Sequence, residues 1–206
     1  MKKQQEHWDR VYQTKAPDTV SWFQEHSTHS LEIIRSIGAA FDAQIIDVGG
    51  GASTLVDDLL AGEFKRVSVL DLSASALDAV RGRLGSLAAK VTWMTGDIRT
   101  IDLPEHTYDI WHDRAVFHFL TDLDDRMAYV RQVMKSVKPG GRVIVATFAP
   151  DGPEQCSGLP VARYDADQLH NEFGAAFELL EHSTEAHTTP WGSVQQFVYC
   201  HCRTPH

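Results

Sequence analysis

Three consecutive glycines, Gly49 to Gly51, follow the short apolar run 44–48 and precede a helix predicted to begin at residue 53. The apolar run is typical of a buried strand. Glycines at the turn permit a positive φ and let a ligand approach the bare backbone. The first turn of the helix presents free backbone N–H groups. The sequence therefore predicts a loop that cradles a small ligand at the end of a strand.

Two carboxylates near this loop narrow the chemistry of the ligand. Asp47 lies just before the glycines, where it would repel a pyrophosphate but suit a ligand that carries an ammonium and a sulfonium. Asp71 ends the next predicted strand, roughly 20 residues on, where a carboxylate holds a ribose diol. Thr54 replaces the third glycine of the dinucleotide motif G-x-G-x-x-G. Together these features favour S-adenosylmethionine, whose product is S-adenosylhomocysteine, over a dinucleotide.

A third turn, Gly96-Asp97-Ile98, closes the strand that follows. Asp97 could accept a hydrogen bond from the exocyclic amine of adenine, and Ile98 could lie on the face of the ring. The alternative is an acidic turn residue that is only solvated.

The elements that must position these residues alternate between strand and helix along most of the chain. Helical periodicity covers 4–13, 27–38, 53–61, 75–84, 122–137 and 165–172, and strand patterns cover 44–48, 66–70, 91–94, 109–112, 142–148, 177–184 and 194–202. Residues 138–141 are predicted to form a turn and 149–164 a long loop. This alternation predicts an α/β fold with a doubly wound, mostly parallel sheet. The last two strands are predicted to form a hairpin, so one of them should be antiparallel.

Composition limits the class of protein further. The 206 residues suffice for one α/β domain, and the net charge of −9 argues against nucleic acid as a partner. No apolar run approaches the roughly 20 residues that span a bilayer, so we expect no membrane partner and a cytoplasmic protein. Cys200 and Cys202 should share one face of a strand. With Cys156 they could form a soft three-thiolate site, but we favour buried filler and expect no metal.

Five segments in a normal order and spacing resemble the class I S-adenosylmethionine-dependent methyltransferases. They are DVGGGAS at 47–53, the strand-end Asp71, GDI at 96–98, YDIWHDR at 108–114 and KPGGRVIV at 138–145. The resemblance covers nearly the whole chain and implies a seven-stranded sheet with an antiparallel last strand and helices on both faces.

The resemblance also implies roles for individual residues. It assigns Asp47, Gly49 and Gly51 to the methionine end of the cofactor, Asp71 to the ribose hydroxyls, and Asp97 with Ile98 to adenine. The complete predicted cofactor site consists of Trp22, Asp47, Gly49, Gly50, Gly51, Asp71, Leu72, Asp97, Ile98 and Asp113.

The reacting end should lie beyond the carboxyl ends of the strands. Asp113 and His118, which follow the fourth strand, are the predicted catalytic residues. His112 could also be a base, although we favour a structural imidazole. Arg114 could bind a substrate carboxylate, but we favour a pair with Asp113. Because the methyl group of a sulfonium is already activated, a missing base does not argue against methyl transfer.

Residues 1–38 are predicted to be a helical lid segment on a core formed by 39–206, within a single domain. The pattern W-D-x-x-Y at 8–12, followed by Trp22-Phe23, is similar to the entry segment of small methyltransferases, including protein-lysine methyltransferases. We expect a small-molecule acceptor, such as a thiol or another soft nucleophile. A protein lysine is the alternative, and a nucleotide-binding module or a nicotinamide-dependent oxidoreductase is less favoured.

Overall fold

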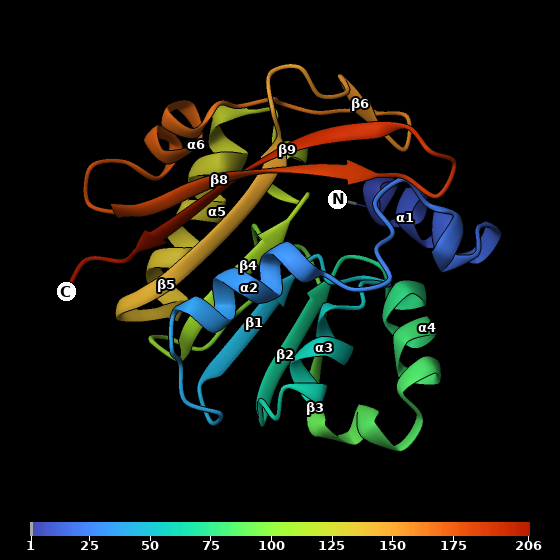
Figure 1. Ribbon diagram of the computed structural model, residues 1–206, viewed down its shortest axis with the longest axis horizontal. Helices are drawn as coiled ribbons and strands as arrows, with labels where there is room; N and C mark the ends of the chain where they lie inside the picture. Colours follow the sequence, from blue (N-terminus) through green and yellow to red (C-terminus); the bar gives the residue numbers. More distant parts are fainter. Residues whose placement is uncertain (1) are drawn as a thin grey trace.

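The sheet contains seven strands, as expected, in the order β3-β2-β1-β4-β5-β9-β8 (Figure 1). The computed structural model describes residues 2–206. The strands are β1 (Gln44–Val48), β2 (Arg66–Asp71), β3 (Val91–Thr95), β4 (Tyr108–Arg114), β5 (Val137–Phe148), β8 (Glu178–Thr188) and β9 (Val194–Arg203). β1 to β5 pair in parallel, whereas β9 is antiparallel to both β5 and β8. The prediction of an antiparallel last strand is therefore confirmed.

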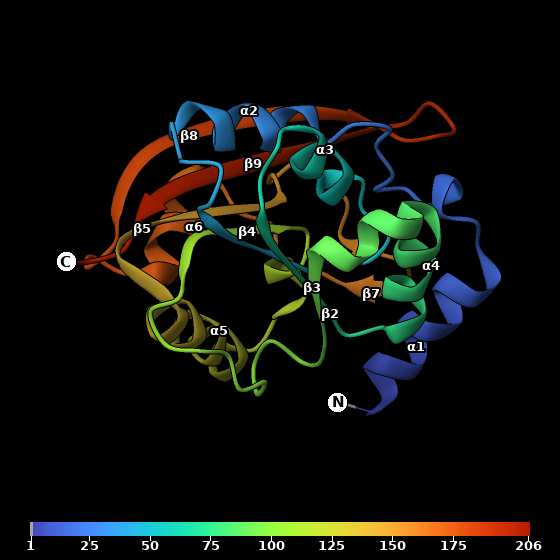
Figure 2. The same ribbon diagram turned by 90° about the horizontal axis from the view of Figure 1, so that it is seen from below.

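Helices cover both faces of the sheet, which confirms the doubly wound α/β fold (Figure 2). Successive strand residues point to opposite faces, so Ile45 packs with α2 (Thr28–Ser36), α3 (Leu55–Ala61) and α4 (Ala74–Leu84). Ile46 packs on the other face with α5 (Leu123–Ser136) and α6 (Ala166–Phe173). Within residues 2–206, no helix is both long enough and apolar enough to cross a membrane.

Two segments differ from the sequence expectation. Residues 138–141, predicted to be a turn, lie inside β5, although Gly140 has a φ of 73°. The end of the chain pairs there: Thr204 N donates to Gly141 O at 3.0 Å, and Gly140 N donates to Pro205 O at 3.2 Å. The predicted loop 149–164 contains a small hairpin of β6 (Gln155–Cys156) and β7 (Leu159–Pro160). Local sequence cannot reveal the first pairing because its partners lie more than 60 residues apart.

The chain order of the sheet reverses at β1, which has β2 on one side and β4 on the other. Open α/β sheets bind ligands in the crevice beyond the strands at such a point. α1 (Lys2–Thr14) lies beside α4 at this edge (Figure 2). It is anchored by Ser73 Oγ, which donates to Asp9 at 2.6 Å, and by Gln13 Nε2, which donates to Ser75 Oγ at 3.1 Å.

Candidate functional site

A cavity opens beyond the carboxyl ends of β1, β2 and β4, where the chain order predicts a ligand site. The space between its walls amounts to about 850 Å³, a volume that includes open solvent at the mouth. A narrower neighbouring cavity shares Tyr12, Trp22, Gly49 and Arg114 with it. The predicted cofactor residues that line one or both cavities are Trp22, Asp47, Gly49, Gly50, Asp71, Leu72, Asp97 and Ile98.

The glycine loop has the backbone geometry that the sequence implied. Gly49 and Gly51 have φ angles of 70° and 38°. Gly49 N donates to Leu70 O at 2.7 Å, which fixes the loop against the end of β2. A Cβ at Gly51 would lie 2.8 Å from Tyr12 Oη and 2.9 Å from Asp71 Oδ2. The loop therefore leaves bare backbone beside the cavity walls.

Gly49→Ala is expected to lower the free energy of unfolding by about 1–2 kcal/mol, because a side chain is strained at positive φ, and to weaken binding of S-adenosylhomocysteine. The added Cβ would also meet Val116 across the loop. Gly82→Ala is the matched control, because Gly82 lies in α4 with nothing within 4 Å of an added Cβ. It should leave binding unchanged and slightly stabilise the helix. Urea unfolding and calorimetry would measure both effects, and equal behaviour of the two variants would contradict the role of Gly49.

Asp47 is a buried carboxylate with one oxygen left unpaired. Its Oδ1 lies 2.7 Å from His112 Nδ1, and His112 Nε2 lies 2.8 Å from Ser30 Oγ. Its Oδ2 is buried without a hydrogen-bond partner in the described part of the chain. That oxygen lies toward Gly50, 2.6 Å from where a Cβ of that residue would be. Because an unpaired buried carboxylate oxygen is costly, this position fits a cationic donor such as the ammonium of the cofactor. His112, held between two partners, orients Asp47.

Asp71 lines the larger cavity at the end of β2. Its Oδ1 accepts a hydrogen bond from Ser73 N at 2.7 Å, and Gly51 N also donates to the carboxylate. Burial is the main reason that its pKa is raised to about 7, and the charges of Asp47 and Asp9 add to the effect. A carboxylate at this position fits the two donors of a ribose diol.

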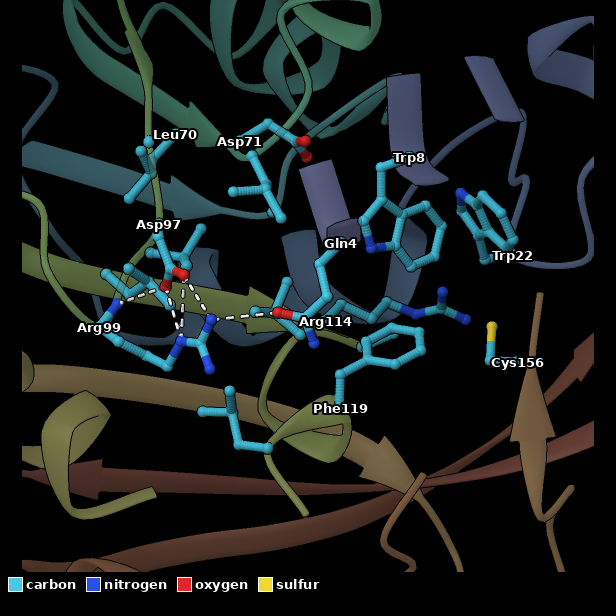
Figure 3. Close-up of a pocket in the computed structure, with 18 of the residues that line it drawn as sticks. Gln4, Trp8, Trp22, Leu70, Asp71, Asp97, Arg99, Arg114, Phe119 and Cys156 are labelled. Carbon is cyan, nitrogen blue, oxygen red and sulfur yellow. Dashed lines mark hydrogen bonds and ion pairs between the residues drawn. The ribbon is translucent and has the colours of Figure 1, made fainter. Parts of the chain in front are cut away.

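Asp97 is engaged by a residue that the sequence analysis did not single out. Arg99 Nε lies 2.8 Å from Asp97 Oδ1, and Arg99 Nη2 lies 3.1 Å from Gln4 Oε1 of α1 (Figure 3). Although burial alone would raise the pKa of Asp97, the hydrogen bonds and charge of Arg99 lower it. Arg99 thus links the adenine-side wall to α1. The contact of Asp97 with adenine stays a prediction, and Ile98 lines the cavity beside it.

Asp113, one of the two predicted catalytic residues, is fully buried and lines neither cavity. It accepts hydrogen bonds from Tyr129 Oη at 2.6 Å, Val116 N at 2.8 Å and Phe117 N at 3.1 Å. Burial raises its pKa to about 6. These contacts fix the turn that follows β4, so they fit a positioning role. Contact with the cofactor or the reacting atoms stays a prediction for this residue.

His118, the other predicted catalytic residue, is also fully buried. Its ring lies 4.5 Å from the ring of Phe119 and 4.7 Å from that of Phe148, between centroids. Neither ring nitrogen has a partner in residues 2–206. Burial, reinforced by the charge of Arg114, lowers its pKa to about 3. The imidazole is therefore neutral and weakly basic, and its catalytic role stays a prediction that this environment does not favour.

The expected pair between Arg114 and Asp113 is wrong. Arg114 Nη2 instead donates to Glu185 Oε2 at 3.1 Å, and Nε donates to Tyr199 Oη at 3.0 Å. Both oxygens of Asp113 instead accept hydrogen bonds from the turn after β4 and from Tyr129 of α5. Glu185 and Tyr199 lie on β8 and β9, far along the chain, and no local pattern links them to Arg114.

The three cysteines do not form the soft site that the sequence left open. Cys200 and Cys202 share one face of β9, as expected, and pack against α5 and α6. Cys156 packs on the opposite face and lines the larger cavity. Burial raises the pKa of Cys156 to about 11 and that of the other two thiols to about 12. The described residues contain no group of three metal-ligating side chains.

Aromatic side chains from the N-terminal segment close one side of the cavity (Figure 3). The ring centroids of Trp8 and Trp22 lie 5.7 Å apart, and Trp8 lies 5.2 Å from Phe119. Tyr12 lies 6.3 Å from Trp22. These edge-on contacts join α1 and the following loop to the turn after β4. The lid role expected for residues 1–38 stays a prediction.

The sequence of the central region matches a family of known proteins. Residues 45–141 match a family model described as a methyltransferase domain. The chain is similar to the ubiquinone/menaquinone biosynthesis C-methyltransferase UbiE of Shewanella woodyi, with 24% identity over 120 residues, 56% of this chain and 47% of that protein. It thus spans about half the length of that relative. Human EEF1A lysine methyltransferase 2 is 23% identical over 194 residues, 85% of this chain and 75% of that protein.

Solved structures share the fold over nearly the whole chain. One, described in work on the conversion of a disulfide bond into a thioacetal group during echinomycin biosynthesis, superposes with a TM-score of 0.80. It covers 98% of this chain and 92% of the other at 15% identity. A likeness at this level of identity establishes the fold alone.

Proposed function

We propose that this chain, whose residues 45–141 match a methyltransferase domain, is a class I S-adenosylmethionine-dependent methyltransferase that transfers a methyl group from S-adenosylmethionine to a small-molecule acceptor. The observation that carries the proposal is a pair of adjoining cavities that together present an unpaired Asp47 oxygen, the strand-end Asp71 and an aromatic cover. These features match the ammonium, the ribose diol and the apolar body of that cofactor.

Each residue would act by binding and alignment. When bound, S-adenosylmethionine supplies an electrophilic methyl group on a positively charged sulfur. Asp47 would accept hydrogen bonds from the ammonium, and Asp71 would accept them from the ribose hydroxyls. Because Gly49 has no side chain, the cofactor could approach the backbone closely between Asp47 and Asp71. Trp22 and Phe119 would exclude water from the reacting end, so that alignment supplies most of the acceleration.

The cover over the cavity supports a small acceptor. Trp8 and Trp22 lie over the space that an acceptor would have to enter, and α1 is tied down by Asp9 and Gln4. A protein side chain on a folded partner would have to reach past this wall. A metabolite needs only a local opening.

A protein lysine is the second candidate, because the human lysine methyltransferase matches 85% of this chain. The aromatic pattern at 8–12 and 22–23 supports it as well. However, the segment 113–120, which begins at the end of β4, reads DRAVFHFL here, and this differs from the acidic residue followed by K-G-T in the lysine-modifying group with the same opening.

Methyl-labelled S-adenosylmethionine should transfer label into small molecules when purified protein is supplied with thiols, amines and carboxylic acids, with a cell lysate assayed in parallel. Label in the small-molecule fraction supports the proposal and identifies the nucleophile class. Label in a discrete protein band would favour the lysine alternative. Tight cofactor binding with no transfer to either pool would point to a binding module.

A further inference from the structure

One end of the larger cavity holds an arginine among apolar and soft side chains. The guanidinium of Arg114 points between Trp22, Phe119 and Cys156 (Figure 3). Its Cζ atom also lies 4.0 Å above the ring centre of Phe197. Few waters can compete for a cation in such surroundings, and a charge-assisted hydrogen bond is strong there.

Two of the three guanidinium nitrogens of Arg114 are fixed by the sheet. Nε donates to Glu185 Oε2 at 3.2 Å and to Tyr199 Oη at 3.0 Å, and Nη2 donates to the same Glu185 oxygen at 3.1 Å. Nη1 makes no hydrogen bond to any of residues 2–206. Although burial opposes the charge, the contacts with Tyr199 and Glu185 hold the pKa of Arg114 above its ordinary value. Nη1 of a rigid, charged guanidinium therefore remains able to donate a hydrogen bond at the cavity.

No described side chain at this end is suited to take a proton from an acceptor near neutral pH. Cys156 stays a thiol because burial raises its pKa to about 11, and burial also raises the pKa of Tyr12. His118, with a pKa of about 3, lines neither cavity. Asp71 is held by the backbone of Gly51 and Ser73 at the position proposed for the ribose. At the reacting end, Nη1 of Arg114 can thus still donate a hydrogen bond, and no described side chain there is suited to act as a base.

We propose that the acceptor is a small anionic nucleophile, of the thiolate class, which the Nη1 of Arg114 binds and aims at the methyl group. This inference rests on the proposed methyltransferase function. A lone pair of the anion forms the bond to the methyl carbon as the carbon–sulfur bond breaks, and the electrons of that bond remain on the sulfur. No proton has to be removed, so no base is required. The product is a neutral, apolar thioether, so it is no longer attracted to the guanidinium.

The first test compares acceptors of different charge and acidity. Thiophenol should be methylated with a kcat/KM at least about 10-fold above that of benzylamine, which must lose a proton to react. Thiophenol is a stronger acid than phenylmethanethiol. The pH at which kcat/KM levels off should therefore lie lower for thiophenol. A faster reaction with benzylamine, or one shared inflection for both thiols, would overturn the anion assignment.

The second test removes the guanidinium without leaving Glu185 charged and unpaired. Arg114→Gln with Glu185→Gln should lower kcat/KM for thiophenol by about 10–100-fold, the value of one hydrogen bond to a charged group. The matched control is Arg203→Gln with Glu178→Gln, which removes a 2.9 Å ion pair between β9 and β8, and neither residue lines either cavity. The control should keep the activity of the parent protein. Urea unfolding would establish that both double variants are folded. If the Arg114 double variant is not folded, Arg114→Lys, which keeps the charge, takes its place.

Binding measurements distinguish the two anionic groups that Arg114 could bind, which are the acceptor and the carboxylate of the cofactor. Calorimetry of thiophenol with the S-adenosylhomocysteine complex involves no reaction, and the Arg114 double variant should bind thiophenol about 10-fold or more weakly. Its affinity for S-adenosylhomocysteine should stay within about threefold. Loss of S-adenosylhomocysteine binding with unchanged acceptor binding would overturn the inference and assign Arg114 to the cofactor carboxylate. Absence of both cofactor binding and transfer would instead refute the proposed function.

Discussion

Asp71→Ala should weaken the binding of S-adenosylhomocysteine by at least about 100-fold, because two hydrogen bonds from a ribose diol to a buried carboxylate are lost. Asp71 is 8% exposed and lies at the cavity end of β2. Isothermal calorimetry measures the effect directly. The matched control is Asp78→Ala, which removes an exposed carboxylate of α4 that pairs with Arg81. A dissociation constant within threefold of the parent protein would refute the assignment of Asp71.

The same residue predicts how binding depends on pH. The pKa of Asp71 is raised to about 7 by burial first and by the charges of Asp47 and Asp9 next. The diol donates to the carboxylate, so the complex requires the deprotonated form and its pKa must be lower. Affinity should therefore fall by about 10-fold from pH 8 to pH 6 through this one group. Asp71→Asn should bind weakly at both pH values and lose this dependence, whereas a flat profile in the parent protein would contradict the prediction.

Asp113→Ala should lower the free energy of unfolding by about 3–5 kcal/mol, since it leaves several buried donors without an acceptor. The affected donors are Val116 N, Phe117 N and Tyr129 Oη, which meet at this carboxylate. Asp113→Asn should lose less, because the amide oxygen can still accept some of these bonds. Urea unfolding at pH 7 would measure both changes.

Kinetics then separate positioning from chemistry at Asp113. If the carboxylate only fixes the turn, Asp113→Asn at a temperature where it is folded should raise KM more than it lowers kcat. A loss confined to kcat would restore the catalytic role that the sequence suggested. An unchanged free energy of unfolding in Asp113→Ala would contradict the structural role.

The strands that frame the site could be predicted within a few residues, because each is a short apolar run between turn residues. The run 44–48 and the strand end at Asp71 are examples, and the glycine loop between them follows from residue type alone. The side chains of Asp47 and Asp71 reach the cavities because neighbouring parallel strands end at one edge of the sheet. Residue type and strand order were therefore sufficient to predict where these two carboxylates lie.

Partners across the sheet could not be predicted in the same way. Arg114 finds Glu185 and Tyr199, 71 and 85 residues away, through the register of β8 and β9. The expectation that it would pair with its neighbour Asp113 failed because backbone N–H groups of the same turn use that carboxylate. The burial of individual side chains could not be predicted either. His118 is a candidate base by residue type, but its complete burial makes it a weak base.

The attachment of α1 ties the N-terminal helix to residues around the larger cavity. Its polar anchors are few: Asp9 to Ser73, Gln13 to Ser75 and Gln4 to Arg99. Each contributes only about 0.5–1.5 kcal/mol, and the packing of Trp8, Val11 and Tyr12 adds to them. Because Arg99 engages both Gln4 of this helix and Asp97, the residue predicted to contact adenine, cofactor binding and the attachment of the helix are expected to be coupled. We therefore expect the bound cofactor to strengthen the attachment of α1.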